Sequence, residues 1–306
     1  MRKDEPRISQ VSRLVIGGKI MKQLPFNIDL SGKTAIVTGG GGVLCSGFAK
    51  TIAACGAKVA ILDLKEDAAK KVADEIVADG GIAMGIATNV LSKESLVAAR
   101  EIILKEYGSI DILINGAGGN NPKGTTTKEY LFPEDLSDVK EDITTFFDLD
   151  PDGISFVFNL NFIGTLLPTQ VFAREMAKVQ APVIINVSSM NSFRPLTKIP
   201  AYSAAKAAVS NFTMWLAVHF SKIGIRVNAI APGFFATAQN HALLFNEDGS
   251  LTPRSDKIIS HTPMGRFGVP EDLDGTLLWL LSDKASGFVN GVVVPVDGGF
   301  AAYSGV

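Results

Sequence analysis

The fold is decided by one stretch near the amino terminus, Lys33-Thr34-Ala35-Ile36-Val37-Thr38-Gly39-Gly40-Gly41-Gly42-Val43. Its first part is apolar and rich in β-branched residues, as is typical of a strand buried on both faces of a parallel sheet. The four glycines then predict a tight turn, and the apolar spacing from Val43 onward predicts a helix. The stretch therefore predicts a strand, a glycine turn and a helix in direct succession.

Beyond this stretch, strand patterns alternate with helical patterns along the chain. Apolar residues recur at helical spacing in residues 66–79, 92–107 and 203–220. The short apolar runs between helices have no polar face, which favours parallel strands. We therefore predict an α/β fold, a single doubly wound domain over residues 25–306 with a mainly parallel seven-stranded sheet. The strands are expected at residues 33–38, 58–63, 82–87, 111–115, 182–188, 225–230 and 292–296.

Two long polar segments interrupt this alternation. Residues 119–158 are rich in Asn, Thr, Asp and Phe, and residues 231–269 contain Pro, Gly, His and Arg. Segments of this length inside one domain are usually functional. Both follow predicted strands, and open parallel sheets bind their ligands beyond the carboxyl ends of the strands. We predict a substrate insertion at about residues 119–158 and a lid at about residues 231–269.

The glycine turn is suited to binding a phosphate group. Glycine lets the backbone approach a pyrophosphate closely, and the helix that follows contributes free N–H groups and partial positive charge. Asp63 ends the second predicted strand, 24 residues after Gly39. A carboxylate there accepts hydrogen bonds from an adenosine ribose and repels the 2′-phosphate of NADP. These features predict a dinucleotide cofactor, NAD rather than NADP. A tight turn without a ligand and a solvated strand-end aspartate are the alternatives.

A second group of residues is the pair Tyr202 and Lys206, four positions apart at the start of a predicted helix. This spacing places both side chains on one helix face, about 5–6 Å apart at Cβ. Because an ammonium stabilises a phenolate, Lys206 is expected to lower the pKa of Tyr202 by about three units, worth about 4 kcal/mol. Tyr202 then becomes usable for general acid–base chemistry. Ser189 lies 13 residues earlier, at the end of a strand, and is expected to hold the substrate oxygen.

With these motifs in place, the chain resembles the short-chain dehydrogenase/reductase family from about residue 32 to residue 300. The resemblance implies a Rossmann-type fold and an NAD(P)-dependent oxidoreductase that interconverts a secondary alcohol and a ketone. Its motifs are highly specific in combination: Thr38-Gly39, Asn115-Gly116-Ala117-Gly118, Asn161-x-x-Gly164, Ser189, Tyr202-x-x-x-Lys206, Asn228, Pro232-Gly233-x-x-x-Thr237 and Asp297-Gly298-Gly299.

The resemblance also implies roles for individual residues. It implies a proton-relay tetrad of Asn161, Ser189, Tyr202 and Lys206. It places Thr237 at the nicotinamide carboxamide, Asn89 at the adenine, and Asn115 and Ala117 beside the adenosine ribose. The full set of implied cofactor-binding residues is Gly39, Gly41, Gly42, Val43, Leu44, Asp63, Asn89, Val90, Asn115, Ala117, Gly118, Tyr202, Lys206, Pro232, Gly233, Phe235 and Thr237.

Two features depart from the family pattern. The family's turn usually reads Thr-Gly-x-x-x-Gly-x-Gly, and Val43 and Cys45 stand at its last two glycine positions. We expect Gly42 to take over the close approach to the cofactor. Asn89 stands where the family more often has aspartate, a change that keeps hydrogen bonding.

Composition argues against several other classes of protein. The 306 residues include 29 basic and 31 acidic ones, a net charge of −2 that gives no electrostatic footprint for nucleic acid or an anionic membrane. No apolar run approaches the length of a membrane span. The three histidines are too scattered for a metal site, and the two cysteines fit a reducing compartment. We therefore expect a cytoplasmic protein with no metal, nucleic-acid or membrane partner.

Polar and cationic residues gather in the segments expected around the substrate. Amides and cations near a hydride acceptor suit a polyhydroxylated substrate with a carboxylate. Lys123, Asn191 and Arg194 are expected to include the groups that bind the carboxylate. Solvated loop polarity is the alternative for each residue. The predicted substrate-binding residues are Asn120, Lys123, Met190, Asn191 and Arg194.

Within the family, the chain is most similar to the D-mannonate oxidoreductase (fructuronate reductase) branch, through its glycine turn, Gly118-Gly119-Asn120 and the long insertion. This similarity implies interconversion of D-mannonate and D-fructuronate with NAD in hexuronate catabolism. A gluconate 5-dehydrogenase-like reductase and a 3-oxoacyl-carrier-protein reductase are alternatives. From another class, a non-catalytic NAD-sensing protein is a further alternative.

Two helices and the amino terminus carry further expectations. Residues 162–172 and 212–220 are apolar nearly all round, so burial on more than one side is expected. Related enzymes pair these helices between subunits, which implies a homodimer or a homotetramer; burial within one subunit is the alternative. Residues 1–24 are expected to be a disordered tail or the product of a misassigned start codon.

Overall fold

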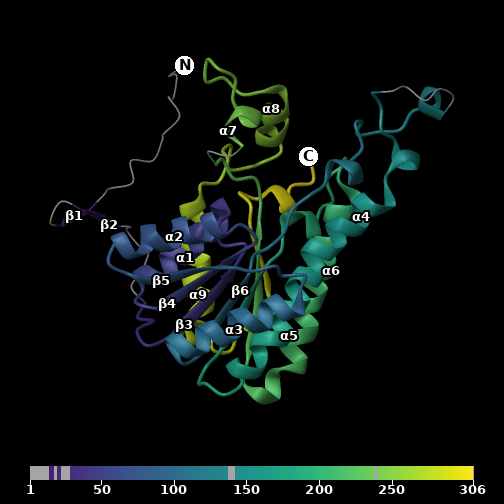
Figure 1. Ribbon diagram of the computed structural model, residues 1–306. Helices are drawn as coiled ribbons and strands as arrows, with labels where there is room; N and C mark the ends of the chain where they lie inside the picture. Colours follow the sequence, from purple (N-terminus) through teal and green to yellow (C-terminus); the bar gives the residue numbers. More distant parts are fainter. Residues whose placement is uncertain (1–13, 17–18, 22–27, 137–141, 238–239, 306) are drawn as a thin grey trace.

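A computed structural model describes residues 14–16, 19–21, 28–136, 142–237 and 240–305, and its centre is a seven-stranded parallel sheet (Figure 1). The strand order is β5-β4-β3-β6-β7-β8-β9, and every neighbouring pair is parallel. This confirms the predicted α/β fold, with a sheet that is parallel throughout. The strands are β3 (Thr34–Thr38), β4 (Lys58–Asp63), β5 (Ile82–Ala87), β6 (Ile112–Asn115), β7 (Val183–Val187), β8 (Arg226–Pro232) and β9 (Val293–Val296).

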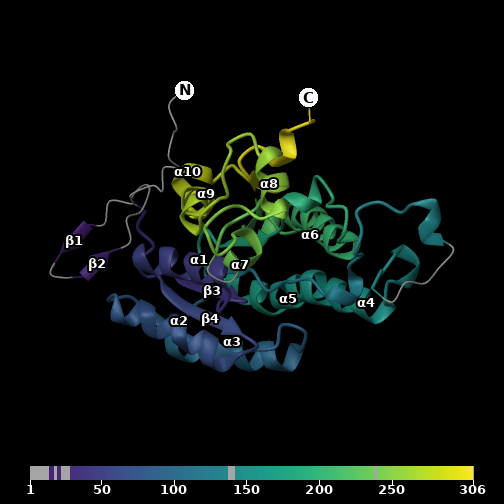
Figure 2. The same ribbon diagram turned by 90° about the horizontal axis from the view of Figure 1, so that it is seen from above.

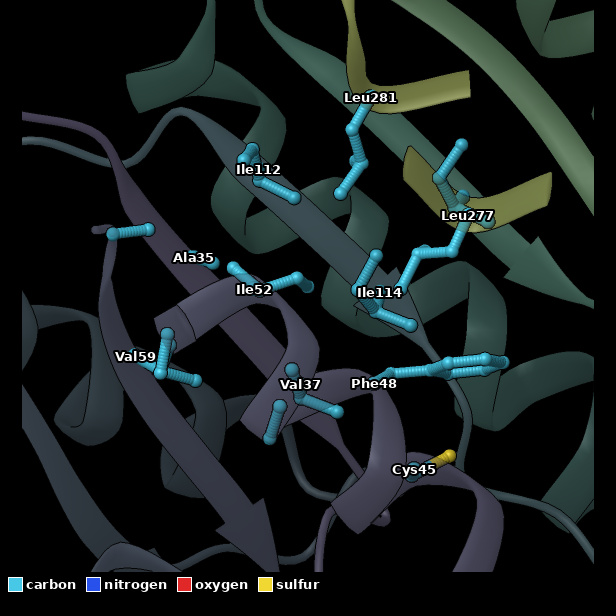
Figure 3. Packing of buried hydrophobic residues seen from close by; sticks show 14 of the residues in the cluster. Ala35, Val37, Cys45, Phe48, Ile52, Val59, Ile112, Ile114, Leu277 and Leu281 are labelled. Atoms are coloured by element: carbon cyan, nitrogen blue, oxygen red, sulfur yellow. The ribbon is translucent and has the colours of Figure 1, made fainter. Parts of the chain in front are cut away.

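Helices cover both faces of the sheet. On one face, side chains of α1 (Val43–Ala54), α2 (Glu66–Ala78) and α9 (Asp274–Leu281) form a core cluster with alternate strand residues. In Figure 3, Ala35 and Val37 of β3 point toward Phe48 and Ile52 of α1. On the other face, α3 (Lys93–Tyr107), α5 (Gly164–Met176) and α6 (Pro200–His219) pack on the intervening residues, such as Ile36. This alternation explains why the central strands carry buried apolar residues on both of their faces.

The predicted insertion begins in short turns and ends in a helix. It contains the short helices η1 (Pro122–Gly124), η2 (Pro133–Leu136) and η3 (Phe146–Asp148). Its last residues form α4 (Pro151–Phe158), because the Asp150 carboxylate accepts N–H bonds from Asp152 and Gly153 and Pro151 suits the first helical turn. Figure 2 shows the insertion extending beside α4, away from the sheet.

One helical stretch, Pro151–Met176, is long and apolar enough by length and composition to span a membrane. It consists of α4, the π-helical segment η4 (Asn159–Ile163) and α5. Half of its apolar window is buried inside the protein, and Phe172 and Met176 of α5 are fully buried in the core. The stretch is therefore a core helix of the fold.

The predicted lid carries α7 (His241–Leu244) and α8 (Pro253–Ser260), which stand beyond one end of the sheet in Figure 1. The Thr252 side chain accepts a hydrogen bond from the Ser255 N–H and so caps α8. Two short helical pieces follow the lid, η7 (Pro270–Leu273) before α9 and α10 (Asp283–Ser286) after it, and η8 (Phe300–Ala302) lies near the carboxyl terminus.

The amino-terminal segment contributes a small separate sheet. Strands β1 (Leu14–Ile16) and β2 (Lys19–Met21) pair in antiparallel fashion. The rest of the predicted tail, residues 1–13, 17–18 and 22–24, lies outside the described residues. The expectation of a tail or a misassigned start therefore stays a prediction.

Candidate active site

The glycine turn places backbone at the carboxyl end of β3. Gly39 has a φ of +62°, a conformation that L side chains rarely adopt. A Cβ atom at this position would also lie 2.8 Å from the Cα atom of Ala117, so the turn and the segment after β6 are in close contact. Gly42 is the N-cap of α1, and its extended backbone leads directly into the helix. The first N–H groups of α1 therefore face the space beyond the sheet, where a phosphate would be stabilised.

Asp63 is tied to the glycine turn. One carboxylate oxygen accepts a hydrogen bond from the Gly41 N–H at 3.1 Å, and the other accepts one from the Lys65 N–H at 3.0 Å. A carboxylate has about four lone-pair sites, so these two bonds leave acceptor capacity for the hydroxyls of a ribose.

Cys45 replaces a family glycine without disturbing the turn. Its thiol packs against Gly116, where an added Cβ would lie 2.2 Å from the sulfur. Because the thiol is buried, its pKa is raised to about 12, so it is a neutral packing group. Val43, the other departure, is the first residue of α1. The thiol of Cys45 and the missing side chain of Gly116 thus fit together, and Gly42 precedes the helix as expected.

Tyr202 and Lys206 lie in the first half of α6. The Nζ atom of Lys206 is 5.7 Å from the centre of the Tyr202 ring and donates a hydrogen bond to the Val187 carbonyl at 2.8 Å. Ser189 follows β7, and its hydroxyl accepts a hydrogen bond from the Asn191 N–H at 3.2 Å. The end of β7 and the start of α6 thus bring the hydroxyl, the phenol and the ammonium to one place.

Burial governs the charges of this group. It raises the pKa of Tyr202, an effect that the hydrogen bond with Ser189 partly opposes. It also lowers the pKa of Lys206 to about 8. The expectation that Lys206 lowers the phenol pKa is therefore wrong for this structure. The physical reason is that the buried phenol loses its solvation, which disfavours the phenolate, while the ammonium lies 5.7 Å from the ring centre.

Asn161 holds the backbone beside Lys206. Its buried amide donates to the carbonyls of Gly119 at 2.7 Å and Val157 at 2.8 Å, and its side-chain oxygen accepts from the Gly119 N–H at 3.2 Å. A Cβ at Gly118 would lie 2.6 Å from this oxygen and 3.1 Å from the Lys206 Nζ atom. Asn161 lies in the π-helical segment η4, a distortion that is frequent at functional sites. It therefore fixes the turn that faces Lys206.

These elements enclose a cleft of about 370 Å³, which we call the main cleft. It runs from the glycine turn and Asp63 to the group formed by Ser189, Tyr202 and Lys206. Ten of the predicted cofactor residues line it: Gly39, Gly42, Val43, Leu44, Asp63, Gly118, Tyr202, Lys206, Pro232 and Gly233. Residues that were not predicted also line it: Cys45, Gly116, Gly119, Val187 and Ser188.

A second cleft of about 330 Å³, which we call the lid cleft, adjoins the first and shares Val43, Leu44 and Gly233 with it. The predicted cofactor residues Phe235 and Thr237 line it. Its other lining residues come from the lid: Phe234, Asn240, Leu243, Leu244 and Arg254.

Several predicted cofactor residues lie outside both clefts. The Asn89 side chain accepts a hydrogen bond from the Leu91 N–H at an exposed site after β5, and Val90 is buried. The Ala117 N–H donates to the Thr38 hydroxyl at 3.3 Å.

Asn115 corrects one expectation. Its amide donates to the Thr169 hydroxyl at 3.0 Å and to the Asn186 side-chain oxygen at 2.9 Å, and the side chain is almost fully buried. Asn115 therefore links β6, β7 and α5 inside the protein, in place of the expected contact with the adenosine ribose. Polar groups in a core need such partners, which explains an asparagine at this position.

The predicted substrate residues divide into two sets. Met190 and Asn191 are buried directly after Ser189, and no described residue bonds the Asn191 side-chain oxygen. Lys123 instead forms an ion pair with Asp150 at 3.3 Å, and the Arg194 Nε atom donates to the Ala301 carbonyl at 3.0 Å. The Asn120 amide donates to the Thr125 hydroxyl at 3.0 Å. None of these five residues lines the main cleft or the lid cleft.

An ion pair joins the insertion to the lid. The Lys257 ammonium of α8 contacts the Glu129 carboxylate of the insertion, and this hydrogen bond is the largest cause of a lowered pKa at Glu129. This ion pair therefore connects the two long polar segments, although Glu129 and Lys257 are 128 residues apart in the sequence.

Comparison with known proteins identifies the class to which this fold and site belong. The family model described as short chain dehydrogenase matches residues 33–247. The chain therefore belongs to the short-chain dehydrogenase family and is an oxidoreductase.

Individual relatives extend this comparison. A solved structure from Haemophilus influenzae, described as a candidate D-mannonate oxidoreductase with bound NAD, is 59% identical, has a TM-score of 0.87 and covers 91% of this chain and 98% of its own. A relative from Bacillus subtilis named as an uncharacterized oxidoreductase is 54% identical over 92% of this chain and 100% of its own length. Two Escherichia coli relatives are each 32% identical over 89% of this chain. One is a 7alpha-hydroxysteroid dehydrogenase, of which 96% of the length is matched. The other is a 2-dehydro-3-deoxy-D-gluconate 5-dehydrogenase, of which 97% of the length is matched.

The residues present fit a nicotinamide dinucleotide. A glycine turn without side chains, the start of α1 and the acceptor at Asp63 meet the needs of a pyrophosphate and a ribose. The polar group around Lys206 lies farther along the same cleft. Members of this family use NAD or NADP, so the main cleft is assigned to such a cofactor.

Proposed function

We propose that the chain is an NAD-dependent oxidoreductase that interconverts a secondary alcohol and a ketone on a sugar acid, with D-mannonate and D-fructuronate as its reactants. The observation that carries the proposal is the main cleft, in which the glycine turn and Asp63 share one space with Ser189, Tyr202 and Lys206. The choice of substrate is supported by the description of the relative that is 59% identical and contains bound NAD.

In the proposed reduction, each residue of the tetrad has one task. The Ser189 hydroxyl hydrogen-bonds the ketone oxygen, and the Tyr202 phenol donates a proton to it. A nicotinamide dinucleotide held by the glycine turn and Asp63 would supply the hydride that, together with this proton, gives the alcohol. Lys206 stabilises the phenolate that remains, and Asn161 keeps the turn at Gly118 and Gly119 in position. A phenol whose pKa is raised by burial is well suited to hold its proton until the ketone is bound.

A second candidate substrate has its own support. A 32% identical relative is named for 5-dehydrogenation of 2-dehydro-3-deoxy-D-gluconate, which is also a sugar acid. The two candidates share a carboxylate and several hydroxyl groups, so a panel of substrates separates them better than any single assay.

The test is turnover of the purified protein with NADH and D-fructuronate, and with NAD and D-mannonate, followed at the absorbance of NADH. The panel also contains D-gluconate, 2-dehydro-3-deoxy-D-gluconate, an acetoacetyl thioester and the uncharged polyol D-mannitol. We expect the highest kcat/KM for the D-mannonate and D-fructuronate pair. A higher value for another sugar acid corrects the substrate, a preference for the thioester points to acyl-carrier chemistry, and no turnover at all supports a sensing role.

Asp63 is predicted to set the choice between NAD and NADP. In Asp63→Asn the charge that repels a 2′-phosphate is removed, while one oxygen remains to accept the Gly41 N–H. We expect the ratio of kcat/KM for NADP over NAD to rise by about ten- to a hundredfold. Asp67→Asn is the control, because it removes an exposed carboxylate of α2 that lines neither cleft. A wild-type protein that already prefers NADP contradicts the assignment of Asp63.

We propose further that the chain acts as a homodimer or a homotetramer in the cytoplasm. Met214, Trp215 and Val218 of α6 remain exposed in the single chain, with 77% exposure at Val218, so burial within one subunit does not account for them. Contiguous apolar surface of this kind marks a protein interface. The free, buried cysteines Cys45 and Cys55 fit a reducing compartment. Light scattering of the purified protein measures the number of subunits.

A further inference from the structure

We propose that Arg254 of α8 binds an anionic group of the bound reactants, either the pyrophosphate of the dinucleotide or the carboxylate of the substrate. This inference rests on the proposed function, because both anions belong to that reaction. It assigns to the lid the cationic role that sequence reasoning gave to Lys123 and Arg194.

The position of Arg254 supports this role. It is the second residue of α8 and lines the lid cleft together with Thr237 and Leu243. The lid cleft shares Val43 and Leu44 with the main cleft, so an anion there would lie between α8 and the start of α1. Of the residues that line these two clefts, only Lys206 and Arg254 carry a basic side chain.

Arg254 is also available for a ligand. Its side chain is exposed, and no ion pair or hydrogen bond joins its guanidinium to any residue in the described part of the chain. Neighbouring cations are already engaged: Lys257 with Glu129, Lys123 with Asp150, and Arg266 with Asp272 through two contacts of 2.6 and 3.0 Å. Lys206 is buried and hydrogen-bonded to Val187. The guanidinium of Arg254 is thus the cation of the clefts that remains open to an incoming anion.

The backbone of α8 is anchored, so Arg254 is presented from a defined position. Ile258 is buried in a cluster with Leu244 and Phe267. The Thr252 hydroxyl donates to the Leu243 carbonyl at 3.0 Å and so connects α8 to α7. The pairing of Lys257 with Glu129 attaches the same helix to the insertion. A planar guanidinium on an anchored helix can form two parallel hydrogen bonds to a carboxylate or a phosphate, which a lysine cannot match.

The experiment compares Arg254→Gln, Arg254→Lys and the control Arg174→Gln. Arg174 is exposed in the last turn of α5, at the end of the sheet opposite the clefts, so its substitution removes the same charge without touching the site. Two quantities are measured: NADH affinity, by titration of its fluorescence, and the ratio of kcat/KM for a sugar acid over an uncharged polyol. Melting curves confirm that each variant is folded.

Contact with the pyrophosphate predicts that Arg254→Gln weakens NADH binding by at least about tenfold and lowers turnover of acids and polyols alike. Contact with the carboxylate predicts unchanged NADH affinity and at least about a tenfold loss confined to acids. Arg254→Lys should recover only part of either loss. Unchanged NADH affinity together with an unchanged preference for acids overturns the proposal, as does an equal effect of Arg174→Gln. If the wild type turns over no sugar acid, the proposed substrate fails, and NADH affinity alone decides the role of Arg254.

Discussion

Replacing Tyr202 by phenylalanine is expected to lower kcat by about two to four orders of magnitude and to leave NADH binding intact. The substitution removes only the hydroxyl that is proposed to transfer the proton. The ring remains, and it packs against a small buried cluster that includes Val157, Ala201 and Ala205. The surfaces that are expected to hold the cofactor, from the glycine turn to Gly233, are unchanged. Single-turnover kinetics with saturating NADH measure the loss at the chemical step.

The control for this variant is Tyr303→Phe. Tyr303 is partly exposed near the carboxyl terminus and lines neither cleft, so the loss of its hydroxyl should not change turnover. A Tyr202→Phe protein that binds NADH and turns over within about tenfold of the wild type would falsify the role of Tyr202 as general acid. A variant that no longer binds NADH would instead give Tyr202 a role in binding.

The fold could be predicted from the sequence because its determinants are local. An apolar run such as residues 34–38 has no polar face, and it lies in the sheet with both faces covered. The glycine turn follows directly, and α1 begins at Val43 as its apolar spacing indicated. The strand ends differ from the predicted ones by two residues at most. The expected insertion was bounded less well, since its last eight residues form α4.

The parts of the site that were predicted also have local signals. Tyr202 and Lys206 share a helix face, Ser189 follows a strand, and Asp63 ends one, so secondary structure alone brings them toward one edge of the sheet. Their location in the main cleft needed no knowledge of distant contacts. The pKa of Tyr202 was predicted with the wrong sign, because a spacing of four reveals a neighbouring charge and does not reveal burial.

Side chains in the insertion and in the loop after Ser189 could not be placed from the sequence. The Lys123 side chain is oriented by its ion pair with Asp150. The Arg194 side chain is oriented by its hydrogen bond to the carbonyl of Ala301, which lies 107 residues away in the sequence. Asn115 was expected beside the adenosine ribose because it begins the family motif Asn115-Gly116-Ala117-Gly118, but its partners Thr169 and Asn186 lie in the core. Each of these contacts is long-range, and a single sequence contains no periodic signal for them.

Replacing Lys206 by methionine is expected to remove most of the activity and yet to stabilise the protein at pH 7. The variant keeps an unbranched side chain in the buried site and loses the ammonium beside Tyr202. Loss of a group that supports proton transfer should lower kcat by at least about a hundredfold. For the same reason, wild-type activity that needs the ammonium should fall as the pH rises above about 8, the pKa of Lys206 in the folded protein.

The expected gain in the free energy of unfolding follows from the difference in the pKa of Lys206 between the folded and the unfolded state. Burial lowers this pKa from its ordinary value of 10.5 to about 8. One pKa unit corresponds to about 1.4 kcal/mol, so a charged Lys206 costs the folded state up to about 3 kcal/mol at pH 7. Between pH 8 and 10.5 the unfolded chain binds the proton more tightly than the folded one, so wild-type stability gains from rising pH over this window. Losing the hydrogen bond to the Val187 carbonyl offsets about 1 kcal/mol of the gain in the variant.

The net expectation for Lys206→Met is a free energy of unfolding about 2 kcal/mol higher than the wild type at pH 7. The difference should shrink as the pH rises through 8 and should disappear or reverse above pH 10.5, where the lysine is neutral in both states. Urea unfolding of both proteins at a series of pH values measures it. Lys178→Met is the control, since Lys178 is exposed and pairs with Glu175 at the end of α5. If the difference between Lys206→Met and the wild type does not depend on pH, the ammonium is not buried at a cost. Lys206 would then act beside Tyr202 only by positioning neighbouring groups.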